Sequence, residues 1–155
     1  MNAILSLFVC LLFISLLNCV GADDSRSLPI RSLAKGAFSG VKEARHEVIR
    51  DADAWEKFWK LHSMAGGSAE KIPAVDFARE MVIAATMGAK RTGGYTIEIV
   101  RVEPAGKSLQ IFVKQTSPPP GALTIQALTA PFHFVAVPKS DLKPEFVEDK
   151  PAAKE

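Results

Sequence analysis

The sequence predicts an α+β, β-rich domain, with a mainly antiparallel, sandwich-like sheet arrangement and one amphipathic helix packed on a sheet. Apolar or alternating segments follow one another after Pro73, at residues 80–87, 95–102, 108–115, 123–128 and 132–137. The connections between them are short, which favours antiparallel pairing. A single stretch, residues 53–62, has the apolar spacing of a helix. The predicted strands and the predicted helix are therefore expected to form one α+β domain.

The earliest elements are a weak strand and a strong helix. Residues 39–50 alternate imperfectly and predict a strand. Asp53 is then placed to cap a helix, with Glu56 three residues later. The apolar face of this helix is expected to press on the sheet, and the pair Gly66-Gly67 to end it. That face consists of Trp55, Phe58, Trp59 and His62.

Two of the later strands differ in pattern. Residues 80–87 form a continuous apolar run, which is typical of a central strand covered on both faces. Leu109, Ile111 and Val113 alternate with polar residues, as expected of a strand with one buried face.

Two loops stand out between the strands. Thr92-Gly93-Gly94-Tyr95 predicts a hairpin connection, because adjacent glycines are favoured where the backbone turns tightly or adopts positive φ. Ser117-Pro118-Pro119-Pro120-Gly121 cannot lie inside a central strand, since proline lacks an N–H. The second loop is either a stiff recognition edge or a rigid crossover.

The N-terminus carries an export pattern. The first 22 residues contain no charged side chain, and residues 3–17 form an apolar run that is short for a membrane span. Residues 1–22 are therefore predicted to be a signal peptide. Two processing outcomes stay open, which are cleavage after Ala22 and lipidation of Cys19. We expect export to the periplasm, the cell envelope or the medium, with membrane attachment only through that lipid.

Composition excludes several classes. Both cysteines, Cys10 and Cys19, lie inside the signal segment, so the exported domain has no disulfide and no thiol nucleophile. The 19 basic and 17 acidic residues are interspersed and offer no stripe for nucleic acid. The expected organisation is a flexible linker over 23–35, one β-rich domain over 36–147 and a disordered tail over 148–155.

No catalytic set, cofactor motif or metal motif is recognisable. The only histidines are His46, His62 and His133, and their spacing matches no metal-ligand pattern. His133 lies between Phe132 and Phe134 on a predicted strand, so it is expected to face away from both rings and toward solvent. The chain is therefore expected not to be an enzyme and to bind no cofactor and no metal.

The order of motifs from residue 75 to 140 resembles the PrcB C-terminal domain family. The resemblance is carried by Val75-Asp76-Phe77, the apolar strand after Glu80, Thr92-Gly93-Gly94-Tyr95, the Pro-Gly loop and Pro131-Phe132-His133. It implies an exported protein associated with a secreted protease complex. Departures are Arg91 before the glycine turn and Ala122 after the Pro-Gly pair.

The sequence therefore predicts a binding module whose partner is a protein. The family resemblance implies that this partner is a protease. The expected binding loops consist of Lys90, Arg91, Thr92, Gly93, Gly94, Tyr95, Pro118, Pro119, Pro120 and Gly121. One alternative is a small-molecule or glycan binder that uses exposed Trp55, Trp59 and Tyr95. Another is an inhibitor similar to chagasin, although the Arg-Pro-aromatic triplet of such inhibitors has no counterpart here.

Overall fold

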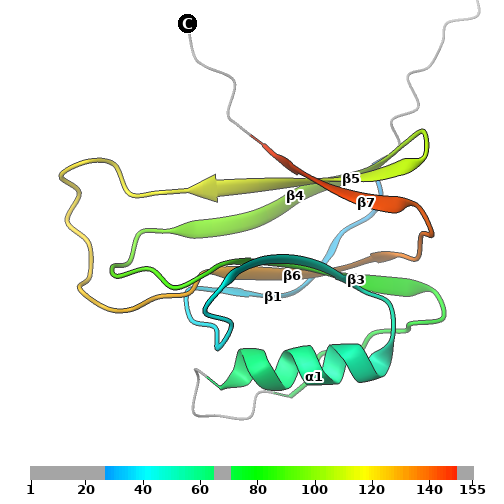
Figure 1. Cartoon of the computed structure of the whole chain (residues 1–155), viewed down its shortest axis with the longest axis horizontal. Helices are drawn as coiled ribbons and strands as arrows, with labels where there is room; N and C mark the ends of the chain where they lie inside the picture. The colour runs from blue at the N-terminus through cyan, green and yellow to red at the C-terminus, as the bar shows by residue number, and fades with distance from the viewer. Residues whose placement is uncertain (1–26, 65–70, 150–155) are drawn as a thin grey trace, which may run out of the picture.

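The helix and strands form three layers. The computed structural model describes residues 27–64 and 71–149. Its elements are β1 (Arg31–Gly36), β2 (Ala44–Ile49), α1 (Ala52–Ser63), β3 (Glu80–Met87), β4 (Thr96–Ala105), β5 (Ser108–Thr116), β6 (Phe132–Pro138) and β7 (Lys143–Glu148). Helix α1 lies under a four-stranded sheet, β1-β6-β3-β2, and a three-stranded sheet, β4-β5-β7, covers the other face (Figure 1). The α+β, sandwich-like prediction is thus confirmed.

Strand β3 shows why the layers form. It is an internal strand, between β6 and β2, and every residue from Met81 to Met87 is buried. Met81, Ile83 and Ala85 pack in the core between the two sheets. Val82 and Ala84 pack in a second core with the helix. Side chains alternate along a strand, so one continuous apolar run serves both cores, as the sequence predicted.

The helix covers the four-stranded sheet with its aromatic face. Trp55, Phe58 and Trp59 pack around Phe134 of β6, with ring centroids 5.1 to 6.4 Å apart. The prediction that Asp53 caps the helix is wrong: the cap is Asp51, whose Oδ1 accepts a hydrogen bond from the N–H of Ala54 at 2.8 Å. Asp53 lies in the first turn. The predicted stop at Gly66-Gly67 falls outside the described residues, and α1 ends at Ser63.

Both ends of the predicted domain need correction. Residues 31–35, expected in a flexible linker, belong to β1, which pairs antiparallel with β6. Glu148, expected at the start of the tail, is the last residue of β7, which pairs with β5 in parallel. Phe146 of β7 packs against the core between the sheets, which explains why a polar, proline-containing segment is ordered. Residues 1–26 and 150–155 lie outside the description.

The predicted strand at 123–128 does not form. The strands on either side of it, β5 and β6, belong to different sheets, so the chain must cross from one layer to the other. Packed sheets lie about 10 Å apart, about twice the spacing of paired strands. Within the described chain, Leu123 to Leu128 have no strand beside them, and only Thr129 forms an isolated bridge, with Lys90.

His133 is buried, which corrects the expectation that it faces solvent. Its ring points away from Phe132 and Phe134, but that side of β6 faces the second sheet. Nδ1 accepts a hydrogen bond from the N–H of Ile99 at 2.9 Å, where the pairing of β4 is irregular. Nε2 lies 3.1 Å from Ser32 Oγ. Because Nδ1 accepts, Nε2 carries the proton and donates to Ser32.

The buried imidazole is held neutral. Burial lowers the pKa of His133 to about 4, and nearby Lys35 acts in the same direction, while Glu98 opposes them. In the unfolded chain the pKa is about 6.5. The folded protein therefore binds fewer protons than the unfolded chain between these values, and stability is complete above about pH 6.5 and falls as the pH drops toward 4.

We predict that His133→Asn flattens this fall. Asparagine can accept the Ile99 hydrogen bond through its carbonyl oxygen but does not titrate. The wild type should lose about 2–3 kcal/mol more than the variant between pH 7.5 and 4, measured by urea unfolding at each pH. Equal losses in both proteins would show that His133 is not held neutral by the fold.

Candidate interaction surface

Three connectors between strands meet at one end of the molecule. They are residues 37–43 between β1 and β2, 88–95 between β3 and β4, and 117–131 between β5 and β6 (Figure 1, left). We call this the connector end. The last turn of α1 also lies there, because the N–H of Gly40 donates to the C=O of His62 at 2.7 Å.

Backbone hydrogen bonds hold the connectors together. Lys90 and Thr129 exchange two, at 2.7 and 2.9 Å, and the N–H of Gly93 donates to the C=O of Ile125 at 3.0 Å. The N–H of Ala130 donates to the C=O of Ala37 at 2.7 Å. These bonds join the two connectors that contain the predicted binding loops, and they join the third connector, 37–43, to them.

The Thr92-Gly93-Gly94-Tyr95 segment is not the predicted hairpin. It carries the chain from β3 in one sheet to β4 in the other. Gly94 does have the positive φ expected of it, at 88°. The pair of glycines is explained by the neighbouring connector: a Cβ on Gly93 would lie 2.6 Å from Cγ1 of Ile125, and one on Gly94 would lie 3.0 Å from Cβ of Pro118. The glycines allow the two crossovers to touch.

The proline loop is divided between support and surface. Pro118 is half-buried against Gly94, whereas Pro119 and Pro120 are exposed. Gly121 has φ of 78°, and the N–H of Ala122 donates to the C=O of Pro119, which closes a turn. The stiff-edge and crossover interpretations of the sequence therefore both apply, to different residues of the same loop.

Exposed apolar side chains concentrate at the connector end. Seven large hydrophobic side chains of the described residues are exposed, and all but Ile72 lie on the connectors or on the adjoining end of α1. They are Phe38, Leu61, Met64, Leu123, Ile125 and Leu128. Leu123 is fully exposed, and Leu128 is 74% exposed. Apolar groups gathered in this way on a surface mark an interaction site.

The charges at this end are mostly basic. Lys42, Lys90 and Arg91 lie on the connectors, against one acidic residue, Glu43. Within the described part of the chain, none of the three cations forms an ion pair with a carboxylate; Lys90 Nζ lies 5.4 Å from the ring centre of Tyr95, and Lys42 Nζ donates to the C=O of Ser39. No charged residue occurs from 115 to 132. The surface therefore combines an uncharged apolar loop with unpaired cations.

The alternative of a ligand-binding surface made of exposed Trp55, Trp59 and Tyr95 is wrong for the two tryptophans. Trp55 is 2% and Trp59 3% exposed, so neither can meet a ligand on the surface. The Trp55 Nε1 donates to the C=O of Pro73, as a buried indole requires. Tyr95 alone is partly accessible, beside Lys90.

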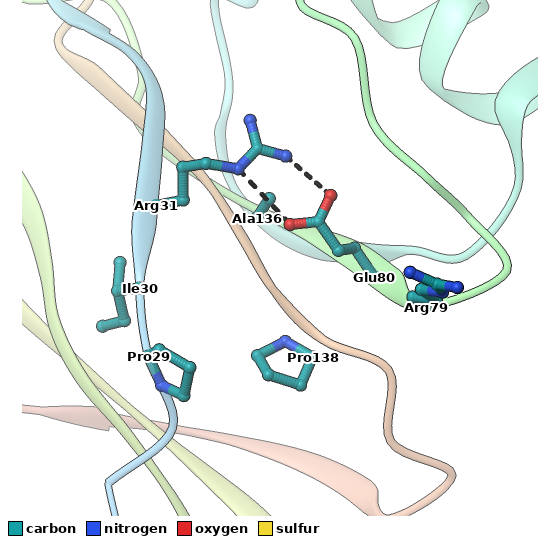
Figure 2. Close-up of a pocket in the computed structure, with 7 residues that line it drawn as sticks. All are labelled: Pro29, Ile30, Arg31, Arg79, Glu80, Ala136 and Pro138. Carbon is teal, nitrogen blue, oxygen red and sulfur yellow. Dashed lines mark hydrogen bonds and ion pairs between the residues drawn. The ribbon is translucent and has the colours of Figure 1, made fainter.

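A depression beside the start of β1 is a weaker candidate for a binding site than the connector end. About 330 Å³ in volume, it is lined by Pro29, Ile30, Arg31, Arg79, Glu80, Ala136 and Pro138 (Figure 2). The guanidinium of Arg31 spans toward Glu80, with a closest N–O distance of 2.6 Å, and its hydrogen bond and charge lower the pKa of that carboxyl. The charged groups of the depression therefore already have partners in the protein, since Arg31 pairs with Glu80 and Arg79 Nε lies 3.8 Å from a carboxylate oxygen of Asp76.

The histidines lie apart. His62 Nδ1 contacts Ser39 Oγ at 3.0 Å beneath the connector end, and His46 stacks on Phe146 with ring centres 4.9 Å apart. Burial lowers the pKa of His46. In residues 27–64 and 71–149, no group of three His, Cys, Asp or Glu side chains is arranged to hold a metal ion.

The helix in that part of the chain is too short and polar to cross a membrane. Cys19 lies outside the described residues.

Sequence reasoning missed Phe38, Leu123, Ile125 and Leu128. Phe38 lies just before the strand predicted over 39–50, and the other three lie in the strand predicted over 123–128, where an apolar residue is expected to face the core. One signal was present: the uncharged run from 115 to 132 continues past the prolines into the aliphatic residues. A buried strand and an exposed apolar loop give the same composition, and only the position of the neighbouring strands separates them.

We predict that Gly94→Ala destabilises the protein more than Gly121→Ala. Both glycines have positive φ, which costs an alanine about 1 kcal/mol. A Cβ at Gly121 meets nothing within 4 Å, whereas one at Gly94 meets Pro118 and Thr124. The difference, roughly 1–2 kcal/mol in free energy of unfolding, measures the contact between the crossovers. Equal destabilisation would mean that the connectors do not touch in solution.

The comparisons with known proteins assign the central part of this scaffold. No curated protein and no solved structure gives a significant match. The family model described as PrcB C-terminal matches residues 81–138, from β3 to the end of β6, within the 75–140 region in which the sequence resembled it. The matched segment contains the two crossovers that build most of the connector end. The resemblance to the PrcB C-terminal family is thus confirmed over residues 81–138.

Proposed function

We propose that this protein is an exported, non-catalytic accessory module that binds a partner protein in a secreted or envelope protease complex. The family name points to a protease complex as the setting. The observation that carries the proposal is the connector end, where two braced crossovers expose aliphatic side chains beside unpaired cations. Binding there needs little ordering of the loops, so more of the contact energy remains as affinity.

The fold also orients this surface. Arg31 pairs with Ala136, near the end of β6, whereas Gly36 pairs with Phe132, at its beginning beside the connectors. The chain therefore enters β1 at the end of the domain opposite the connector end. A lipid on Cys19 would tether the module from that opposite side. Cleavage after Ala22 would instead release it, and mass spectrometry of the mature N-terminus distinguishes the two.

Protease inhibition, similar to that of chagasin, is the second candidate. The observation that favours it is that three connectors between strands lie at one end of the molecule (Figure 1). The charge pattern does not distinguish an inhibitor from an accessory subunit. Residual activity of papain and of the host's envelope proteases in the presence of the purified protein would separate them, since an accessory subunit leaves papain unaffected.

We predict that a photo-crosslinking amino acid at position 123 captures a protease subunit in the cells that make this protein. The matched control is position 107, which is exposed in the β4–β5 turn at the opposite end. Mass spectrometry of the adducts should identify a protease subunit for position 123 and not for position 107. Equal capture at both positions, or adducts without any protease component, would contradict the proposal.

A further inference from the structure

Residues 122–128 combine the sequence of a strand with the absence of a strand partner. Leu123 and Ile125 alternate with Thr124 and Gln126, the pattern that predicted a strand here. The structure places no strand beside them within the described residues. Places where a locally consistent signal fails in the folded protein are expected at functional sites.

The backbone of this segment is ready to pair. From Ala122 to Gln126 the chain runs without a turn or a bend. Among the described residues, none of the backbone N–H groups from Leu123 to Leu128 has a hydrogen-bond acceptor in the protein. A strand edge with free N–H groups is a template for an extended segment of another chain.

One of these groups can be oriented from the covalent geometry. The C=O of Ile125 accepts the hydrogen bond of Gly93, so it points into the molecule. A trans peptide bond directs its C=O and N–H to opposite sides, and the described chain has no cis peptide. The N–H of Gln126 therefore points away from the Gly93 connector, toward the outer edge of the segment.

The segment also lacks the features that protect edges. Soluble proteins blunt exposed strand edges with lysine, proline or inward charges. The edge strands β2 and β7 follow this rule: Arg45 pairs with Glu47 at 2.8 Å on β2, and β7 contains Lys143 and Pro144. Residues 122–128 contain no charge and no proline, and Leu123, Ile125 and Leu128 are exposed.

The positive charges of Lys90 and Arg91 favour a foreign partner over a second copy of this chain. Lys90 and Arg91 lie on the connector that is bonded to this segment. Pairing of two copies of the chain through residues 122–128 would bring four such cations to one interface, which like charges disfavour. A foreign strand with acidic residues beside it would instead complement them.

We propose that residues 122–126, which precede the bend at Ala127, add as a strand to an apolar sheet edge of the partner, with Lys90 and Arg91 against acidic residues that flank that edge. The inference rests on the proposed function, since it specifies how the partner is bound at the connector end. The N–H of Gln126 would donate to a backbone carbonyl of the partner strand. Leu123 and Ile125 would enter apolar pockets on one of its faces.

The test is amide hydrogen exchange on the full chain, free and in the protease complex isolated from its own cells. Protection of amides within residues 122–126 on binding is the expected result. A complex in which these amides exchange as fast as in the free protein would overturn the strand pairing and leave the proposed function standing. Failure to find any protease complex would overturn both. Protection caused by a homodimer would overturn the choice of a foreign partner.

A matched pair of variants isolates the backbone hydrogen bond. Gln126→Pro and Gln126→Ala both remove an exposed side chain whose amide donates one hydrogen bond, to the C=O of Thr124, but only proline also removes the backbone N–H. The proline variant should bind the complex roughly 2- to 10-fold more weakly than the alanine variant, as expected for one hydrogen bond. Unchanged thermal unfolding of both variants shows that they are folded, and equal binding would refute the role of the Gln126 amide.

Discussion

The contact between two crossovers is the constraint on which the connector end depends. Each crossover must carry the chain between two sheets whose strands do not pair with each other, and neither crossover has a strand neighbour of its own. They solve this by bonding to each other, through Lys90 with Thr129 and Gly93 with Ile125. The approach is close enough that a single Cβ on Gly93 would displace Ile125. The glycine pair, which has the sequence of a turn motif, therefore serves to let the 117–131 connector pack closely against residues 93 and 94.

This bracing explains why an apolar loop can remain exposed without collapsing into the core. The cores on both sides of the four-stranded sheet are filled by the aromatic face of α1 and by the side chains between the sheets. Leu123 and Leu128 belong to neither core and are exposed. Their exposure therefore has a free-energy cost that a bound partner would recover, at roughly 25 cal/mol for each Å² of apolar surface that it covers.

The sequence specified the local elements well and their arrangement less well. The continuous apolar run from Met81 to Met87 predicted a central strand, and the aromatic spacing of 55–62 predicted an amphipathic helix, because both patterns are local and reflect burial of the element itself. It could not show that β3 and β4 lie in different sheets, since a short glycine-rich connection suits a hairpin and a crossover equally. The same ambiguity made residues 123–128 a predicted strand. Strands β1 and β7 were missed because Arg31, Lys35, Lys143 and Glu145 give their segments the composition of a tail, although a few apolar residues, such as Phe146, suffice to dock each on a sheet edge.

Backbone ¹⁵N relaxation of residues 117–131, together with nuclear Overhauser effects between Gly93 or Gly94 and the side chains of Ile125 and Pro118, tests the bracing most directly. The account predicts these contacts in solution and order parameters of about 0.85, close to those of the strands. Absent contacts and order parameters below about 0.6 would show two independent, flexible loops. A connector end of that kind would present no preformed surface, and the account would fail.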